Sequence, residues 1–294
     1  MSDKPMTFIR RFLAAAPASV VASVAILAVL AISAVLAGQI CGHAPEAVNL
    51  MNRLKPPVPF SGSAFNHLLG TDELGRDILS RLLHGMRISF LIALAGTVAG
   101  ASIGLGLGFM AAHFRGLVDD MVLTAIDFNA ALPFIIMALA MLAFFGSQIY
   151  IIIAIMAVYG WDRYARLARN LSLSALTEGY AGALLALGAS PGRIYIRHIL
   201  PNIAGVLIVN MTLNFPGTIL LETSLSFLGV GVQPPLTSLG VLLGFGRDYL
   251  TTAWWIAVAP GTVIVMVTLS ITVLGDFIIG SLDGTYSFSK SDRL

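Results

Sequence analysis

The stretch that decides the fold is ISFLIALAGTVAGASIGLGLGFMAAHF, residues 88–114, which contains no Asp, Glu, Lys or Arg. An uncharged apolar run of this length is enough for a helix to cross the roughly 30 Å hydrocarbon core of a bilayer. Because a charge at mid-bilayer is costly, uncharged stretches between charged residues mark membrane-spanning segments. Residues 88–114 therefore predict a transmembrane helix.

The same stretch carries four glycines at successive i+4 positions, Gly96, Gly100, Gly104 and Gly108. Residues at this spacing share one helix face, and small residues there let a second helix backbone approach closely. Chance is an alternative, because the chain contains 29 glycines. The strict register favours helix packing, which identifies a contact and not an activity.

Four further uncharged stretches bring the total to six predicted helices. Residues 17–37 form the first helix, and residues 198–221 and 249–275 form the fifth and sixth. The stretch 128–161 is too long for one span, and Gly146-Ser147-Gln148 divides it into two helices. A signal peptide is rejected for residues 17–37, because the apolar run is about twice the 7–15 residues expected. The predicted fold is all-α, a polytopic membrane protein with six transmembrane helices.

Composition supports this fold class. Hydrophobic residues make up 57% of the 294 residues and charged residues only 11%, against about 25% charged in an average soluble domain. The mean hydropathy is +0.89. So much apolar surface excludes a soluble globule and a disordered chain, and it requires a lipid bilayer as partner. The net charge of only +2, with scattered Lys and Arg, argues against binding to nucleic acid. The single cysteine, Cys41, permits no intrachain disulfide.

Orientation follows from Lys and Arg, which gather in short cytoplasmic loops. Basic residues precede the first helix, lie between the fourth and fifth, and end the chain: Lys4, Arg10 and Arg11; Arg163, Arg166, Arg169, Arg193 and Arg197; Lys290 and Arg293. With six spans these groups share one side, which predicts both termini in the cytoplasm. The segment 39–87 also carries basic residues, but it is long enough to weaken the rule.

The segment 39–87 is predicted to lie on the outer side. Pro56-Pro57-Val58-Pro59 excludes a helix interior there. Further along, apolar and charged residues alternate at helical spacing, with Ile78, Leu82 and Leu83 opposite Arg76, Asp77 and Arg81. This pattern predicts an amphipathic helix over residues 74–88 that lies on the outer membrane surface.

The segment between the fourth and fifth helices predicts a helix–glycine turn–helix unit in the cytoplasm. A helix over residues 163–187 ends at Gly188, and Pro191 cannot continue it. A short helix over residues 193–199 then runs into Pro201. Ala183, Leu184 and Leu187 would be exposed in a lone protein. An apolar ridge on a cytoplasmic loop predicts a docking partner.

Several chemistries lack their motifs. The three lysines, Lys4, Lys55 and Lys290, do not follow glycines, so the chain has no P-loop and is not expected to bind ATP in that way. No two of the five histidines have the spacing of a zinc protease. An intramembrane enzyme is disfavoured because a nucleophile–base pair is lacking. We therefore expect no catalytic residue, no metal and no cofactor.

Polar residues within the predicted spans are candidates for a translocation path. The polar residues Asn210, Thr212 and Asn214, together with Pro216, are expected to interrupt the fifth helix, and Glu222 lies at its far end. Polar groups in lipid mark substrate pathways by default. A structural hydrogen bond to a neighbouring helix explains Glu222 equally well, and interhelical hydrogen bonds explain the asparagines nearly as well.

Three stretches resemble the C-type permease of bacterial ABC importers for dipeptides, oligopeptides and nickel. They are LGTDELGRDILSRLLHGMRIS at residues 69–89, LGAS at 187–190 followed by RHILPN at 197–202, and ETSLSFLGVGVQPP at 222–235. The similarity covers essentially residues 10–285. It implies the fold of a type I importer permease in the bacterial inner membrane, with cytoplasmic N-terminus and first helix at 1–38, a periplasmic segment at 39–87, a core at 88–285 and a tail at 286–294.

The resemblance also implies partners. A homologous second permease would complete the pathway, two cytoplasmic ABC ATPases would hydrolyse ATP and dock on a coupling loop at about 165–201, and a periplasmic solute-binding protein would deliver the substrate. The loop positions this implies are Glu178, Gly182, Ala183, Leu184, Gly188, Ala189, Ser190 and Arg193.

The sequence departs from the family pattern at two places. The signature acid of the loop is replaced by Gly182, so Glu178 does not take over its role automatically. Residues 274–283, LGDFIIGSLD, lack an Arg-Asp pair that relatives carry. The leading hypothesis is a permease subunit of an ATP-driven importer whose substrate the sequence does not name. The alternative is a self-sufficient secondary transporter or channel, which would show internal repeats and paired charges at midplane.

Overall fold

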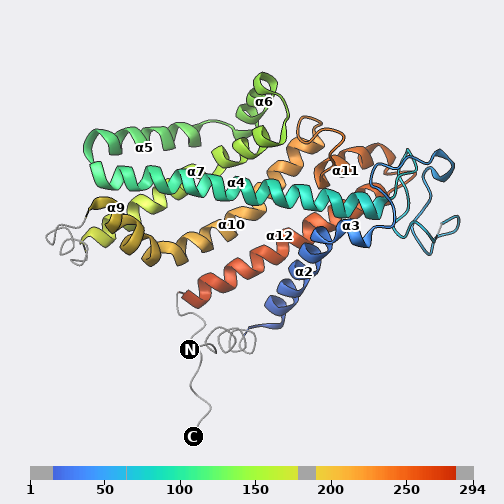
Figure 1. The fold of residues 1–294 in the computed structure, drawn as a ribbon, viewed down its shortest axis with the longest axis horizontal. Coiled ribbons are helices and arrows are strands. Elements are labelled where there is room, and N and C mark those ends of the chain that lie inside the picture. The colour runs from blue at the N-terminus through green and yellow to red at the C-terminus, as the bar shows by residue number, and fades with distance from the viewer. Residues whose placement is uncertain (1–15, 64, 178–189, 283–294) are drawn as a thin grey trace, which may run out of the picture.

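The computed structural model describes residues 16–63, 65–177 and 190–282, and those residues form an all-helical protein. Outside the helices, the described residues contain one isolated β-bridge, between Thr71 and Asp77. The helices form an elongated bundle, and the irregular segment 41–77 lies at one end of it, on the right in Figure 1. We call this the Asp72 end, and the opposite end, where α9 (Pro191–Ile194) lies, the Arg193 end.

Helix α4 (Ile78–Phe114) runs the length of the bundle, and α7 (Ile149–Thr177) packs against it (Figure 1). The two run parallel, because Gly96 lies against Met156 and Gly108 against Ala165. Glycines on the shared face explain the closeness of the pair, since a side chain there would separate the two backbones. Together, α4 and α7 are the axis around which the other helices pack.

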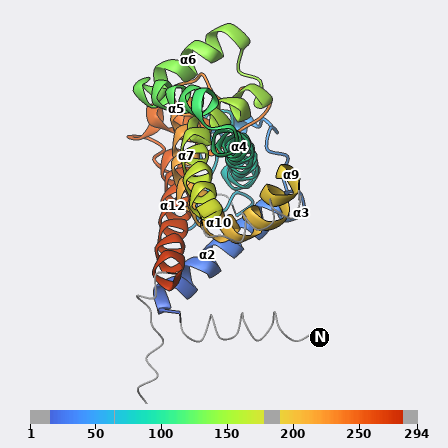
Figure 2. The same cartoon turned by 90° about the vertical axis from the view of Figure 1, so that its left-hand side faces the viewer.

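One side of α4 is covered by helices from the two ends of the chain. Helix α2 (Ala18–Val35), the short α3 (Ala37–Ile40), α11 (Leu239–Gly246) and α12 (Trp255–Leu282) bury aliphatic side chains together against it. Figure 2 shows α2 and α12 descending next to each other, away from α4. Helix α11 was not expected from the sequence. Ser238 begins it by accepting a hydrogen bond from Val241 N at 3.3 Å, and Leu239 and Leu242 bury it.

Two sequence expectations about helix breaks at proline are corrected. The expected break at Pro201 is absent, because α9, a π-helical turn at Tyr195–Ile199 and α10 (Leu200–Phe227) form one continuous rod. The wider turn and the N-terminal position of Pro201 accommodate a residue without an N–H. Pro216 does not interrupt α10 either, and it lies buried inside the helix.

The third predicted helix is divided in the structure, where a single helix was expected from the sequence. The structure has two helices, α5 (Gly116–Ala131) and α6 (Phe134–Phe145), bent by 93°. Pro133 stands between them, where it has no N–H to continue the first helix and a backbone suited to begin the second. The predicted separation at Gly146-Ser147-Gln148 is present, because α6 ends at Phe145 and α7 begins at Ile149.

The expected surface helix over residues 74–88 is also corrected. Residues from Ile78 onward are the first turns of α4, and Asp77 caps that helix by accepting a hydrogen bond from Ser80 N at 2.8 Å. Arg81, expected on a polar face, is buried together with Leu82 and Leu83. The segment joins the bundle because its charges are paired internally.

Within the described residues, four helices are long and apolar enough to cross a membrane: Ala18–Val35, Ile78–Phe114, Pro191–Phe227 and Trp255–Ser281. The bent pair α5–α6 would make a fifth crossing if it acts as one span. Helix α7 lies parallel to α4 but is more polar toward its end, where it carries Asp162, Arg163, Arg166 and Arg169. The chain is therefore a multi-pass membrane protein, and six crossings remain a prediction.

Candidate transport site

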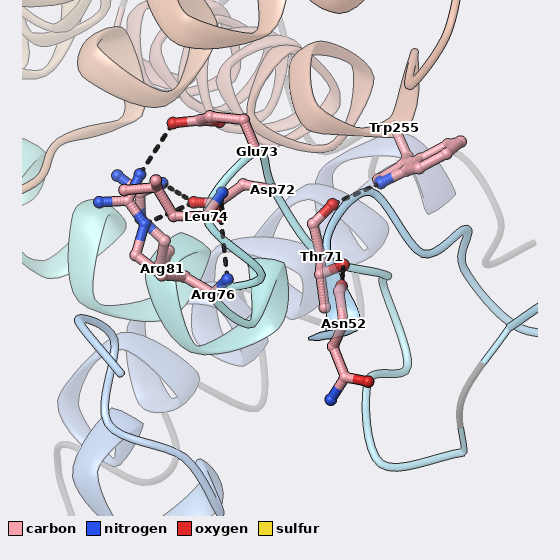
Figure 3. A network of polar contacts seen from close by, with 8 residues as sticks. All are labelled: Asn52, Thr71, Asp72, Glu73, Leu74, Arg76, Arg81 and Trp255. Atoms are coloured by element: carbon pink, nitrogen blue, oxygen red, sulfur yellow. Dashed lines mark hydrogen bonds and ion pairs between the residues drawn. The ribbon is translucent and has the colours of Figure 1, made fainter. Parts of the chain in front are cut away.

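Residues 70–77, GTDELGRD, fold into a tight turn before α4 whose centre is the carboxylate of Asp72 (Figure 3). Asp72 has no exposed surface and accepts hydrogen bonds from the backbone N–H groups of Leu74 and Arg76, both at 2.9 Å. Its Oδ2 also pairs with Arg76 Nε at 2.6 Å and with Arg81. A buried carboxylate is stable only with such partners. The turn is thereby fixed to the first turns of α4.

The neighbouring Thr71 links this turn to α12. Its carbonyl accepts a hydrogen bond from Trp255 Nε1 at 3.1 Å, and its hydroxyl donates to the carbonyl of Asn52 (Figure 3). Gly70 has a φ of +81°, and a Cβ there would lie 2.9 Å from Trp255 Nε1 and 2.5 Å from the carbonyl oxygen of Lys55. Only glycine satisfies both the backbone angle and the contact. The turn therefore positions the start of both long helices.

A cavity of about 700 Å³ opens beside this turn. Cationic side chains of α4 line it on one side, and the residues that precede and begin α11 line the other. The lining includes Glu46, Arg76, Arg81, His84, Arg87, Pro234, Pro235 and Phe245. Arg76 and Arg81 both pair with Asp72, and Arg76 also pairs with Glu73, whereas Arg87 is exposed. The cavity is large enough for a small solute and offers basic groups on an apolar frame.

Glu222 lies deeper, where α4, α10 and α11 meet, and it is completely buried. Its carboxylate accepts hydrogen bonds from Ser89 Oγ of α4 at 2.9 Å and from Ser226 Oγ of α10 at 2.8 Å. The two hydroxyls in turn accept from the backbone N–H of Leu239 and Val232, both at 3.1 Å. The carboxylate is thus the centre of a polar network that ties three helices together, and it does not face the cavity.

The four glycines of α4 are all buried against α7. A Cβ at Gly96 or Gly104 would overlap Met156 or the carbonyl of Trp161, and one at Gly100 would lie 2.7 Å from the carbonyl oxygen of Ala157. A Cβ at Gly108 would lie 2.5 Å from the carbonyl oxygen of Ala165. The close contact that these glycines permit is therefore between α4 and α7 of the same chain.

Asn210 and Asn214 lie on α10, one turn apart and partly exposed. Asn210 Nδ2 donates to the carbonyl of Val206 at 3.0 Å, and Asn214 Nδ2 donates to the carbonyl of Asn210 at 2.9 Å. The Oδ1 of Asn214 accepts from Arg163 of α7. Asn214 therefore joins α10 to α7, while Asn210 bonds to its own helix.

Six of the eight expected coupling-loop positions lie outside the described residues: Glu178, Gly182, Ala183, Leu184, Gly188 and Ala189. Ser190 and Arg193 are described, and both are exposed around the start of α9. Next to them lies a cavity of about 300 Å³, lined by His113, Arg115, Pro191 and Tyr195 among others. Ile194 and Tyr195 anchor this end of the rod in a cluster with Ala112 and Ala175.

Sequence reasoning missed the ion pairs that hold α5 to α7. Both side-chain oxygens of Asp119 pair with Arg169, and Arg166 NH2 lies 3.0 Å from Asp127 Oδ1. Each of the three arginines of α7 has a partner on another helix. The sequence does contain acids that could pair with these arginines, at Asp119, Asp120 and Asp127. They lie about 40 to 50 residues from the arginines along the chain, so a local sequence pattern does not predict the pairing.

These observations define a class: a multi-pass membrane protein with a solute-sized cavity at one end. Comparison with known families is decisive. Residues 104–286 match the family described as binding-protein-dependent transport system inner membrane component. Since this match covers more than half of the chain, the protein belongs to that family of transport permeases.

Individual relatives extend the similarity beyond the family region. The di/tripeptide transport system permease protein of Pseudomonas aeruginosa is 37% identical over 230 residues, which cover 78% of this chain and 76% of the relative. The dipeptide transport system permease protein of Haemophilus influenzae is 30% identical over 96% of this chain and 98% of its own length. The oligopeptide transport system permease protein of Mycobacterium bovis is 32% identical over 94% and 92%.

The family membership settles several expectations. The chain is a permease subunit of an ABC importer and a multi-pass protein of the bacterial inner membrane, as its sequence predicted. It works within a complex that includes ATPase and binding-protein partners.

Proposed function

We propose that this chain forms half of a transmembrane pathway that imports short peptides. The observation that carries the proposal is the near end-to-end similarity to permeases named for dipeptide and oligopeptide transport, in which the 41–77 segment and the α4–α7 core are both included. A homologous second permease would supply the other half. Specificity would depend chiefly on the binding protein, because the chain offers few charged groups along its spans.

In this proposal both termini lie in the cytoplasm and the chain crosses the membrane six times. The fold supports this path because α4 and α7 run parallel, and the bent pair α5–α6 lies between them in sequence. Two parallel helices separated by one connecting crossing fit the second and fourth spans. The Asp72 end is then periplasmic, and residues 39–87 face the binding protein.

The Arg193 end is then cytoplasmic and would receive the ATPases. We place two ATPase subunits, one for each permease, against residues 165–201 and their counterpart in the second permease. ATP hydrolysis belongs to those subunits. Support comes from the rod formed by α9, the π-helical turn and α10, which connects exposed Ser190 and Arg193 directly to the buried network of Glu222. A displacement of the loop is thereby passed to the centre of the bundle.

Asn210 and Asn214 remain the proposed path-lining residues, because they are partly exposed on α10 and carry amides that can bond to a peptide backbone. For Glu222, complete burial and two serine donors support a structural role. The 700 Å³ cavity at the Asp72 end would be the periplasmic mouth of the path.

The test is uptake of a labelled dipeptide by a strain that lacks its own peptide permeases. We expect uptake only when this chain is expressed with its second permease, its ATPases and its binding protein, and loss of uptake when ATP binding by the ATPases is abolished. Proteoliposomes that contain this chain alone are the counter-test. Accumulation driven there by an ion gradient would establish a self-sufficient transporter and overturn the proposal.

A further inference from the structure

Three side chains that bind metals in other proteins gather at the Asp72 end, outside the cavity lining. His67 and Asp77 are buried, His43 is exposed, and one potential ligand atom of each lies within 4.8 Å of the others. The rings of His43 and His67 lie 4.8 Å apart between centroids, with their planes at 37°. His43 and His67 are 24 residues apart in the 41–77 segment, and Asp77 ends that segment, so the loop brings the three side chains together.

The two buried members already have the geometry of neighbouring ligands. His67 Nδ1 lies 3.0 Å from Asp77 Oδ1, and Asp77 Oδ2 is held by Ser80 N at 2.8 Å as the cap of α4. Ligand atoms of a tetrahedral Zn²⁺ site with bonds of about 2.0–2.1 Å lie about 3.3 Å apart. An ion can therefore replace the proton between the two atoms with a movement of a few tenths of an ångström, while the cap remains intact.

We propose that His43, His67 and Asp77 form a site for a borderline divalent cation, specifically Zn²⁺, that fastens the 41–77 segment to the start of α4. Two imidazole nitrogens and one carboxylate oxygen are the donors that Zn²⁺ accepts in proteins. The ion is a resident of the protein, separate from the imported cargo. Because His43 is exposed, the fourth position is open to water.

The surroundings of His67 provide the second shell that such a site needs. With the ion on Nδ1, the Nε2 atom carries a proton and requires an acceptor. The amide of Asn52 lies there, with its Nδ2 at 3.5 Å from Nε2. Its oxygen becomes the acceptor when the amide turns over, which is an ordinary adjustment for Asn. Partners of this kind orient metal-bound histidines.

The competing explanation is a helix cap supported by a His–Asp hydrogen bond without a metal. In that explanation His43 only packs its ring against His67, because only His67 and Asp77 take part in the hydrogen bond. His43 is therefore the residue that separates the two accounts. It is also exposed, so replacing it leaves the packing of the fold intact.

The experiment titrates Zn²⁺ into the full-length chain, purified in detergent with a histidine-free tag and stripped with a chelator. We expect about one Zn²⁺ per chain, an increase in melting temperature on binding, and a tetrahedral absorption spectrum with Co²⁺. His43→Ala should weaken binding about tenfold or more and abolish the increase in melting temperature. His198→Ala, at the Arg193 end, is the matched control and should bind like the wild type.

The proposal is overturned if the wild type binds no Zn²⁺, or if His43→Ala binds it as tightly as the wild type. His67→Gln provides a second check on a buried ligand. Its circular dichroism shows whether the helices persist, and binding that survives in a folded His67→Gln variant also contradicts the assignment. None of these readouts depends on peptide uptake, so the metal site and the proposed function succeed or fail separately.

Discussion

Single residues set how closely α4 and α7 approach, and Gly104 is among the most confined. A Cβ there would overlap the carbonyl of Trp161 and lie 2.8 Å from both Ala165 N and Tyr164 Cβ. Gly104→Leu should therefore separate the helices and lower the melting temperature of the purified protein by about 5 °C or more, as overpacking does elsewhere. Gly106→Leu is the matched control, since nothing lies within 4 Å of its Cβ position. Equal melting temperatures for the two variants would contradict the packing account.

Glu222 offers a second test at the residue scale, because its structural and transport roles can be separated. Glu222→Ala removes the acceptor of two buried serine hydroxyls, each of which then costs about 1–3 kcal/mol. We expect a lower melting temperature and less monodisperse protein. Glu222→Gln keeps an acceptor and should fold and transport normally, as should the exposed-residue control Asp120→Ala, which lies outside the cavity lining. A Glu222→Gln variant that folds normally but imports no peptide would assign the carboxylate to the path.

Between elements, the ion pairs of α5 and α7 allow a charge-swap experiment. Asp119 and Arg169 form a two-bond pair whose side chains are only 17% and 20% exposed, whereas Arg166 and Asp127 are 53% and 72% exposed. We expect Asp119→Arg to destabilise the protein clearly and Arg169→Asp in the same chain to restore most of the loss. Exposed pairs contribute about 0–1 kcal/mol, so Asp127→Arg should have little effect. Melting temperatures in detergent measure the effect of the charge swap and of the Asp127→Arg control.

The helices could be predicted from the sequence where lipid alone dictates the pattern. Uncharged runs predicted an all-helical membrane protein, because a helix in lipid requires apolar side chains. The break at Gly146 was predicted because a turn requires a residue that interrupts the helix. The bend at Pro133 was not predicted, and the break that was predicted at Pro201 is absent. Whether a proline bends or continues a helix depends on the neighbouring turn and its packing, which a local pattern does not contain.

The candidate site was predicted less completely, for a related reason. The glycine spacing indicated a close helix contact, and the four glycines lie against α7. Arg81 was expected at a surface because its sequence neighbours alternate with apolar residues. Its partner Asp72 lies nine residues earlier, in a turn that sequence periodicity does not describe. Pairings between distant residues, such as Ser89 with Glu222, depend on the tertiary fold.

At the scale of the whole molecule, the orientation in the membrane is directly testable. In a Cys41→Ser background, Arg193→Cys and Met51→Cys place single exposed thiols at opposite ends of the molecule. A membrane-impermeant thiol reagent should label Met51→Cys in intact spheroplasts and Arg193→Cys only in inside-out vesicles. Arg247→Cys, next to the end of α11, should follow Met51→Cys. The opposite labelling would reverse the proposed topology.

The continuity of α4 has a mechanical consequence. Its 37 residues form a rod about 55 Å long, nearly twice the thickness of the hydrocarbon core. The Asp72 turn clamps one end of this rod, and the glycine face couples its length to α7. A rod of that length works as a lever arm: pivoting by about 5° moves its tip by about 5 Å. With the Asp72 end clamped, a rotation of this size therefore appears as a displacement of about 5 Å at the Arg193 end, where the ATPases are proposed to dock.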